Sequence, residues 1–329
     1  MISVTLISYN SPEVTIEAIG SIIKSLEKYN IDGEIIVVDN NSTENNVKLI
    51  EKIFPNVALI CLDENIGFAR AHNLALQKTR GKYVFIANSD VVLRDNVFGN
   101  SIEKFEHDPD LAAIGPLVYE KDGSMASTSR DFVFYSLLST MLSVANAVFP
   151  LATRAESQHM PKFLKNTIFK NHESVNPIFE SRYVDWIDGM FVGFRRSFLE
   201  RIGLFDSFYF FDHEIGDILN RLRDAGGSIY FDTSQSITHL GGHSRKRNPK
   251  IIRASLIGYI HYIYNNRKDY FYPIAFEICI LSYLRSIYAR AIRNSSDHEL
   301  WHAISSEALS YIRKPIKREY TIPQLGEVQ

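Results

Sequence analysis

The sequence predicts an α/β fold built around a mostly parallel central sheet with helices on both faces. Segments with the pattern of buried strands alternate with segments of helical apolar spacing four times in the first hundred residues of a 329-residue chain. Such alternation favours parallel strands joined by crossover helices. Three of the predicted strands also end in polar turns, which points to a ligand site at one edge of the sheet.

Each element of this prediction has its own local signal. The predicted strands are short apolar runs at 2–8, 34–42, 57–62 and 82–93. Apolar residues recur at helical spacing in 12–29, and shorter helices are expected at 44–53 and within 65–79. An apolar and aromatic run at 269–293 predicts a helical extension at the C-terminal end.

Composition excludes several classes of protein. A net charge of −2 argues against broad nucleic-acid binding, which needs a basic surface. Two cysteines far apart in sequence, Cys61 and Cys279, form neither a disulfide framework nor a zinc motif, so a reducing cytoplasmic setting is expected. The first residues lack the basic segment and cleavage site of a secretory signal. No uninterrupted apolar run reaches the roughly 18 residues of a membrane span.

The polar turns lie where ligands bind in open α/β sheets. Tyr9 and Asn10 follow the first predicted strand, 39–42 ends the second, and 88–90 interrupts the fourth. Polar residues are common in any turn, so it is their presence in all three turns that carries the inference. No GxGxxG follows the first strand and no GxxxxGK[ST] occurs, which excludes an ordinary dinucleotide-binding or P-loop protein.

Six motifs in order resemble one known family. They are SYN, VVDNNS, NIGFARAHN, NSDVVL, the run WIDGMFVGFRRSFLERIGLFDSFYFF, and ITHLGGHS. Together they resemble the family 2 inverting glycosyltransferases with the GT-A fold, in the rhamnosyltransferase-like branch of bacterial surface-polysaccharide synthesis. The resemblance covers about 2–245, so a GT-A domain is expected over 1–245 and a helical region, a candidate for membrane association, over 246–329. It implies a dTDP- or UDP-sugar donor and a saccharide or lipid-linked acceptor.

The donor's chemistry agrees with this resemblance. Its flat base can stack on Tyr9, and Asp39 can accept the N–H of a pyrimidine; the resemblance implies the same use of both positions. Asn10 and Asn41 lie beside them in the two turns and are expected to contact the donor. For Tyr9, packing on the sheet is the structural alternative.

A divalent cation is expected to neutralise the pyrophosphate leaving group. Mg²⁺ or Mn²⁺ does this when carboxylate and phosphate oxygens hold it. The family's aspartate motif corresponds here to Asn88, Ser89 and Asp90, of which only Asp90 is a carboxylate. The resemblance also makes His239 an accessory ligand of the metal or phosphate, although a lone histidine is more often structural.

Two further motifs contribute expected substrate contacts. In NIGFARAHN, Arg70 and Asn73 are expected to contact the donor, since an arginine adds fixed positive charge near a pyrophosphate. In VDWIDGMF, Trp186 and Asp188 are expected to contact sugar, and Gly189 would let the backbone approach it closely. The structural alternative for Arg70 is an ordinary surface arginine, and the alternative for VDWIDGMF is a core strand.

An inverting transferase needs one base, usually a carboxylate, to deprotonate the acceptor hydroxyl. The family places an acidic motif at the start of a helix, and here Glu214, Asp217 and Arg221 match it. Ile215 occupies the position where the family commonly has the second acid. Glu214 is therefore the favoured base, with Asp212 and Asp217 as alternatives; Asp217 becomes structural if it pairs with Arg221 four residues on.

Two apolar segments leave alternatives open. Residues 131–152 and 269–293 mix apolar, aromatic and polar side chains, which suits either a membrane interface or packing against the catalytic domain. Peripheral attachment to the inner face of the cell membrane would suit a lipid-linked acceptor. The rival functions are a non-catalytic nucleotide-sugar-binding or scaffold protein, supported by Ile215, and a sugar nucleotidyltransferase.

Overall fold

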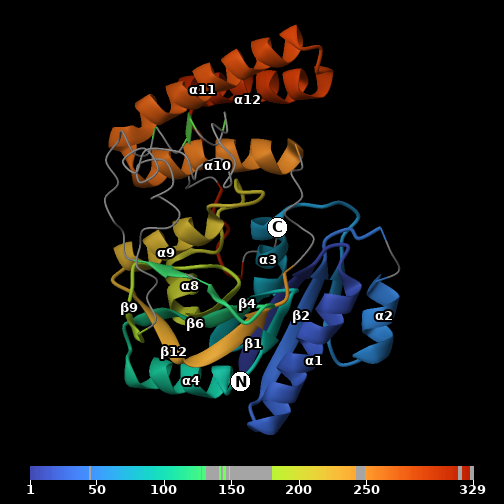
Figure 1. Cartoon of the computed structure of the whole chain (residues 1–329). Coiled ribbons are helices and arrows are strands. Elements are labelled where there is room, and N and C mark those ends of the chain that lie inside the picture. The colour runs from blue at the N-terminus through green and yellow to red at the C-terminus, as the bar shows by residue number, and fades with distance from the viewer. Residues whose placement is uncertain are drawn as a thin grey trace.

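The chain folds into a sheet with helices on both faces and a stack of three C-terminal helices (Figure 1). This computed structural model describes residues 1–43, 46–126, 128–130, 141, 144–145, 148, 180–241, 249–317 and 321–326. The apolar segment predicted at 131–152 lies almost entirely outside these residues.

The central sheet of the described chain has 10 strands. In spatial order they are β3 (Ala58–Cys61), β2 (Gly33–Asp39), β1 (Ile2–Ser8), β4 (Tyr83–Asn88), β11 (Phe191–Arg195), β6 (Leu111–Glu120), β12 (Ser228–His239) and β5 (Val91–Leu93), with β7 (Met125–Ala126) on β6 and β9 (Arg182–Tyr183) on β12. The first four are parallel, as predicted. β11 runs antiparallel to both neighbours, so the whole sheet is mixed.

The strand predicted over 82–93 is two strands. β4 ends at Asn88, the chain turns at Ser89 and Asp90, and β5 pairs with β12 at the far edge of the sheet. The turn that breaks the apolar run is therefore also the turn that carries the predicted metal ligand.

Helices cover the sheet because alternate strand residues point to opposite faces. One face packs against α1 (Pro12–Lys28) and α4 (Val97–His107). The other packs against α3 (Phe68–Leu76), α8 (Arg196–Ile202) and α9 (Glu214–Asp224). The remaining N-terminal helix is α2 (Asn46–Ile53), and a separate two-stranded sheet joins β8 (Ser129–Arg130) to β10 (Trp186–Ile187).

Three C-terminal helices form a further apolar core. They are α10 (Pro249–Asn266), α11 (Lys268–Ala291) and α12 (Ser295–Arg313). A buried polar chain fastens them to the sheet domain: His261 Nε2 lies 2.8 Å from Asp206 Oδ2, and His261 Nδ1 lies 2.5 Å from the hydroxyl of Tyr311. Within the described ranges, no helix has the length and apolarity needed to cross a membrane.

Candidate active site

The predicted donor residues meet at the edge where β1, β2 and β4 end. Ser8 is paired in register with Asp39, and Ile7 with Asn88, so the three turns that follow are neighbours. Tyr9 extends beyond β1 with 47% of its surface exposed. Nearly half of Tyr9 is therefore accessible to a flat ligand.

Hydrogen bonds tie the first two turns together. The Asn10 side-chain oxygen accepts from the Thr43 backbone N–H at 2.7 Å and from its hydroxyl at 3.0 Å. Buried Asp39 accepts from the Ser42 N–H at 3.0 Å and hydroxyl at 2.6 Å. Asn10 and Asn41 have positive φ values of 50° and 65°, which asparagine tolerates better than most residues. These residues shape the rim of the site.

Asn40 is a site residue that the sequence reasoning passed over. Its buried amide donates to Asn65 Oδ1 at 3.1 Å and accepts from the Ile66 N–H at 3.0 Å. It thereby holds the loop that leads into α3. At Gly67, φ is 85° and an added Cβ would lie 2.3 Å from the Phe210 carbonyl oxygen, so this loop packs against the segment that enters α9. The doubled asparagine in VVDNNS was the available signal.

Arg70 and Asn73 form hydrogen bonds with backbone groups of the loop before α9. The Asn73 amide donates to the Phe205 carbonyl at 2.8 Å and accepts from the Phe205 N–H at 3.0 Å. Arg70 Nε donates to the Ser207 carbonyl at 2.8 Å. Both side chains leave α3 toward the loop before α9 and help to position that loop, and their contact with the donor stays a prediction.

Asp90 and His239 lie together as the metal prediction requires. His239 Nε2 is 3.2 Å from Asp90 Oδ2, and His239 Nδ1 is 3.0 Å from Glu120 Oε2. The hydrogen bond to Asp90 raises the pKa of His239 to about 9, helped by Glu120 and opposed by burial. Glu120, the last residue of β6, was missed by sequence reasoning because it belongs to none of the motifs.

This group fits a divalent cation as a partial ligand set. Two ligands of one octahedral Mg²⁺ lie about 3 Å apart, close to the separation of Asp90 Oδ2 and His239 Nε2. A carboxylate on the second nitrogen of a ligating histidine is the usual supporting arrangement, and Glu120 supplies it. No cluster of three or more metal-ligating side chains occurs in the described chain, so donor phosphates and water would complete the shell.

Glu214 is buried at the start of α9. Its Oε2 has no hydrogen-bond partner among the described residues. Desolvation by burial raises the pKa of this carboxyl to about 8, and the charge of Asp212 adds to the rise. Asp212 itself is exposed, and the N-cap position is His213, whose side chain makes no capping bond. Glu214 thus combines an unsatisfied buried carboxyl oxygen with a raised pKa.

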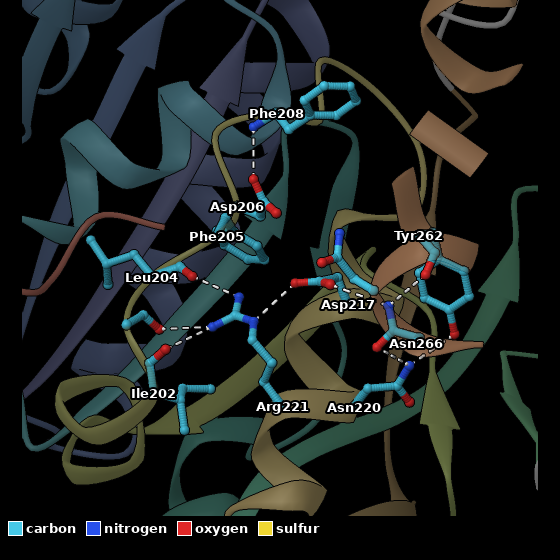
Figure 2. A network of polar contacts seen from close by, with 12 residues as sticks. Ile202, Leu204, Phe205, Asp206, Phe208, Asp217, Asn220, Arg221, Tyr262 and Asn266 are labelled. Carbon is cyan, nitrogen blue, oxygen red and sulfur yellow. Dashed lines mark hydrogen bonds and ion pairs between the residues drawn. The ribbon is translucent and has the colours of Figure 1, made fainter. Parts of the chain in front are cut away.

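Asp217 forms a buried ion pair with Arg221. Arg221 Nε lies 2.9 Å from Asp217 Oδ2, and its other nitrogens donate to the carbonyls of Ile202 at 2.9 Å and Leu204 at 2.7 Å (Figure 2). Figure 2 also shows Asn266 of α10 turned toward Asp217. The geometry therefore supports a structural role for Asp217, because its charge pairs with Arg221 and this pair fixes α9 to the preceding loop.

The VDWIDGMF motif packs on the start of α9. Trp186 Nε1 donates to Asp188 Oδ1 at 2.8 Å. A Cβ at Gly216 would lie 2.2 Å from the Trp186 ring, and a Cβ at Gly189 would lie 2.5 Å from Ile215 Cγ1. Gly189 thus makes room for Ile215, and its predicted approach to a sugar stays a prediction.

Contacts between loops bring these parts to one edge. The Asn88 N–H donates to the Met190 carbonyl at 2.9 Å, next to Gly189 and hence to α9. The Leu240 N–H donates to the Asp90 carbonyl at 2.8 Å, and the Phe68 N–H donates to the Phe210 carbonyl at 2.8 Å. The arrangement joins the exposed Tyr9, the paired side chains of Asp90 and His239, and the buried Glu214 carboxyl.

Comparison with known proteins identifies the family. The model of glycosyl transferase family 2 matches residues 3–172, just over half of the chain. The chain belongs to glycosyl transferase family 2. The family expected from the six motifs is therefore confirmed, and so is transfer of a sugar from a nucleotide-sugar donor as its activity.

Curated relatives include two kinds of polysaccharide enzyme. The chain is 25% identical over 226 residues to N-acetylglucosaminyl-diphospho-decaprenol L-rhamnosyltransferase of Mycobacterium tuberculosis, covering 65% of this chain and 69% of that protein. It is 36% identical over 115 residues to poly-beta-1,6-N-acetyl-D-glucosamine synthase of Staphylococcus aureus, covering 34% of this chain and 27% of that protein.

A solved structure shares the fold. GalNAc-T7, crystallised with UDP, GalNAc and Mn²⁺, superimposes with a TM-score of 0.58 at 15% identity, over 96% of this chain and 57% of that one. This likeness confirms the GT-A fold class that the strand and helix alternation and the six motifs predicted.

Proposed function

We propose that this transferase moves a deoxyhexose such as rhamnose from a dTDP- or UDP-sugar to a lipid-linked saccharide, with inversion and with Glu214 as the base. The observation that carries the proposal is the buried Glu214 carboxyl, whose Oε2 lacks a partner in the described chain. The 25% identity to a rhamnosyltransferase whose name specifies a diphospho-decaprenol acceptor supports the substrate classes.

In this proposal the donor binds to side chains in the turns at the edge of the sheet. The exposed Tyr9 ring stacks on the base. Asp39 already accepts two hydrogen bonds from Ser42, and its remaining lone pairs accept the N–H of a pyrimidine. Asn41 and Ser89 flank the phosphate path from the two adjoining turns.

Asp90 and His239 would hold Mn²⁺ or Mg²⁺, with Glu120 orienting the imidazole. The cation, when bound, supplies positive charge that stabilises the nucleoside diphosphate as a leaving group. Without it, protonated His239 donates its Nε2–H to Asp90 and its Nδ1–H to Glu120, so binding of the cation at Nε2 would release the Nε2 proton.

Transfer is a single displacement at the anomeric carbon. Glu214 Oε2 takes the proton of the acceptor hydroxyl as the oxygen attacks, and the bond to the diphosphate breaks on the opposite face of the sugar. Because burial raises the pKa of Glu214 to about 8, the carboxylate is a stronger base than an exposed glutamate. The ionised fraction, and with it the rate, rises with pH up to about that value. Trp186 and Asp188 orient sugar hydroxyls beside it.

The same proposal places the enzyme peripherally on the inner face of the cell membrane, where surface polysaccharides are built on lipid carriers. The test is release of nucleoside diphosphate from a panel of dTDP-, UDP- and GDP-sugars with Mn²⁺ or Mg²⁺, in the presence of a prenyl-diphosphate-linked amino sugar. Metal-dependent release together with a glycosylated lipid supports the proposal and names the donor. Tight donor binding with no product from any lipid-linked acceptor would contradict it and favour a non-catalytic binding protein.

A further inference from the structure

One face of α11 exposes an uninterrupted series of large apolar side chains. Of the 16 exposed large hydrophobic residues in the described chain, half lie on this helix or at its C-cap. They are Tyr272, Phe276, Ile280, Tyr283, Leu284, Ile287, Tyr288 and Ile292. Their spacing of three and four residues places them on one side of the helix. We call this series the α11 ridge.

The opposite face of α11 is equally apolar and is packed. Phe271, Ile274, Ala275 and Ile278 are buried in the core that α11 shares with α10 and α12. A helix that is apolar on all sides is normally buried on all sides. Contiguous exposed patches of this kind mark interaction surfaces, so the α11 ridge requires a partner.

The charges around the ridge indicate the chemistry of that partner. Within 270–289 the charged residues are Glu277 and Arg285. Glu277 is half-buried, and burial raises its pKa to about 7. Arg285 turns toward α12, where its guanidinium lies over the Trp301 ring at 4.2 Å. The exposed cations Lys268, Arg290 and Arg293 lie at the two ends, where Asp269 beside Lys268 is paired with Arg267. An apolar, tyrosine-rich band ending in cations matches an anionic lipid surface.

We propose that the α11 ridge is the surface by which this protein lies on an anionic membrane, with α11 parallel to the bilayer plane. Its other face is packed against the bundle, so the helix stays attached to the protein while the ridge enters the headgroup region. Figure 1 shows α11 and α12 as the outermost layer on the side of the sheet where β1 ends. The inference rests on the proposed function, because it takes the acceptor to be lipid-linked. A membrane bound at α11 would then present that acceptor on the side of the molecule that holds the donor site.

The test is flotation of the full chain with vesicles of phosphatidylglycerol and phosphatidylcholine, compared with phosphatidylcholine alone. Each basic residue near an anionic surface contributes roughly fivefold to partitioning, so binding should fall at least tenfold on neutral vesicles. Ile280→Asp with Leu284→Asp should abolish flotation. The matched control is Leu49→Asp with Ile53→Asp on α2, an exposed leucine and isoleucine with the same four-residue spacing, and it should float like wild type.

Other partners of the ridge give different results. If the ridge joins two copies of the chain, the α11 double variant becomes monomeric by light scattering and wild type does not float. If the chain's own 131–152 segment covers it, the variant loses thermal stability and wild type does not float. Either result overturns the proposal. Donor turnover with a short, water-soluble acceptor should be unchanged in the α11 variant, which separates failure of membrane docking from failure of the proposed activity.

Discussion

Burial of the Glu214 carboxyl lowers the stability of the fold, so Glu214→Gln should stabilise the protein and, on the proposed mechanism, inactivate it. In the unfolded chain this carboxyl ionises near pH 4.5, whereas burial in the folded state raises its pKa to about 8. Between these values the folded protein binds a proton that the unfolded chain has released. Stability therefore falls as pH rises from about 4.5 to about 8.

The size of the effect follows from this linkage. Each pH unit above the unfolded pKa contributes about 1.4 kcal/mol, so holding Glu214 protonated in the fold destabilises it by about 3 kcal/mol at pH 7. A neutral amide of the same shape removes the effect. For a chain of 329 residues, the expected rise in Tm is about 4 °C.

The assay is thermal unfolding of wild type and Glu214→Gln at about pH 5 and about pH 8. The two proteins should unfold almost together at the lower pH and separate at the higher. Glu277→Gln is the matched control, because burial raises the pKa of Glu277 to about 7 and its Oε2 has no partner among the described residues. It should gain less stability and keep full transferase activity. A difference between wild type and Glu214→Gln that is independent of pH would refute the reasoning.

Three further predictions concern the surroundings of the site. Glu120→Gln removes the carboxylate behind His239 and should raise the Mn²⁺ concentration for half-maximal activity by about 10–100-fold, measured by metal titration. Arg221→Met leaves the buried Asp217 carboxylate unpaired and should lower the unfolding free energy by about 3–5 kcal/mol, measured by urea denaturation; a loss below about 1 kcal/mol would contradict the buried pair. Ile215→Asp places an acid against Gly189 and should destabilise the fold by about 2–4 kcal/mol without raising the transfer rate, checked by unfolding and turnover together.

The part of the site that depends on strand ends could be predicted from the sequence. Apolar runs fix β1, β2 and β4, and parallel pairing brings their carboxyl ends together, so the placement of Tyr9 and Asp39 follows from local pattern. The pairing of Asp90 with His239 came from motif resemblance, because 149 residues separate them and no local pattern relates them. The pairing of Asp217 with Arg221 was one of two open alternatives that helical spacing allowed.

The rest depended on tertiary contacts that a sequence pattern does not contain. Asn73 faces the Phe205 backbone, 132 residues away, and its hydrogen-bonding groups are used there. Gly189 faces Ile215, so this glycine makes room for a side chain of α9, a contact that its own motif does not indicate. Glu120 lies outside every motif, and its position beside His239 follows only from the pairing of β6 with β12.

The most direct test of the account compares single-turnover sugar transfer by wild type, Glu214→Gln and Asp212→Asn, with saturating donor, metal and lipid-linked acceptor. A general base contributes about 10²–10⁴-fold to the rate, so Glu214→Gln should lose at least about a hundredfold. Asp212 is exposed, so the Asp212→Asn variant should transfer sugar at a rate within a few-fold of wild type. Near-normal transfer by Glu214→Gln, or an equal loss in Asp212→Asn, would contradict the assignment of Glu214 as the base.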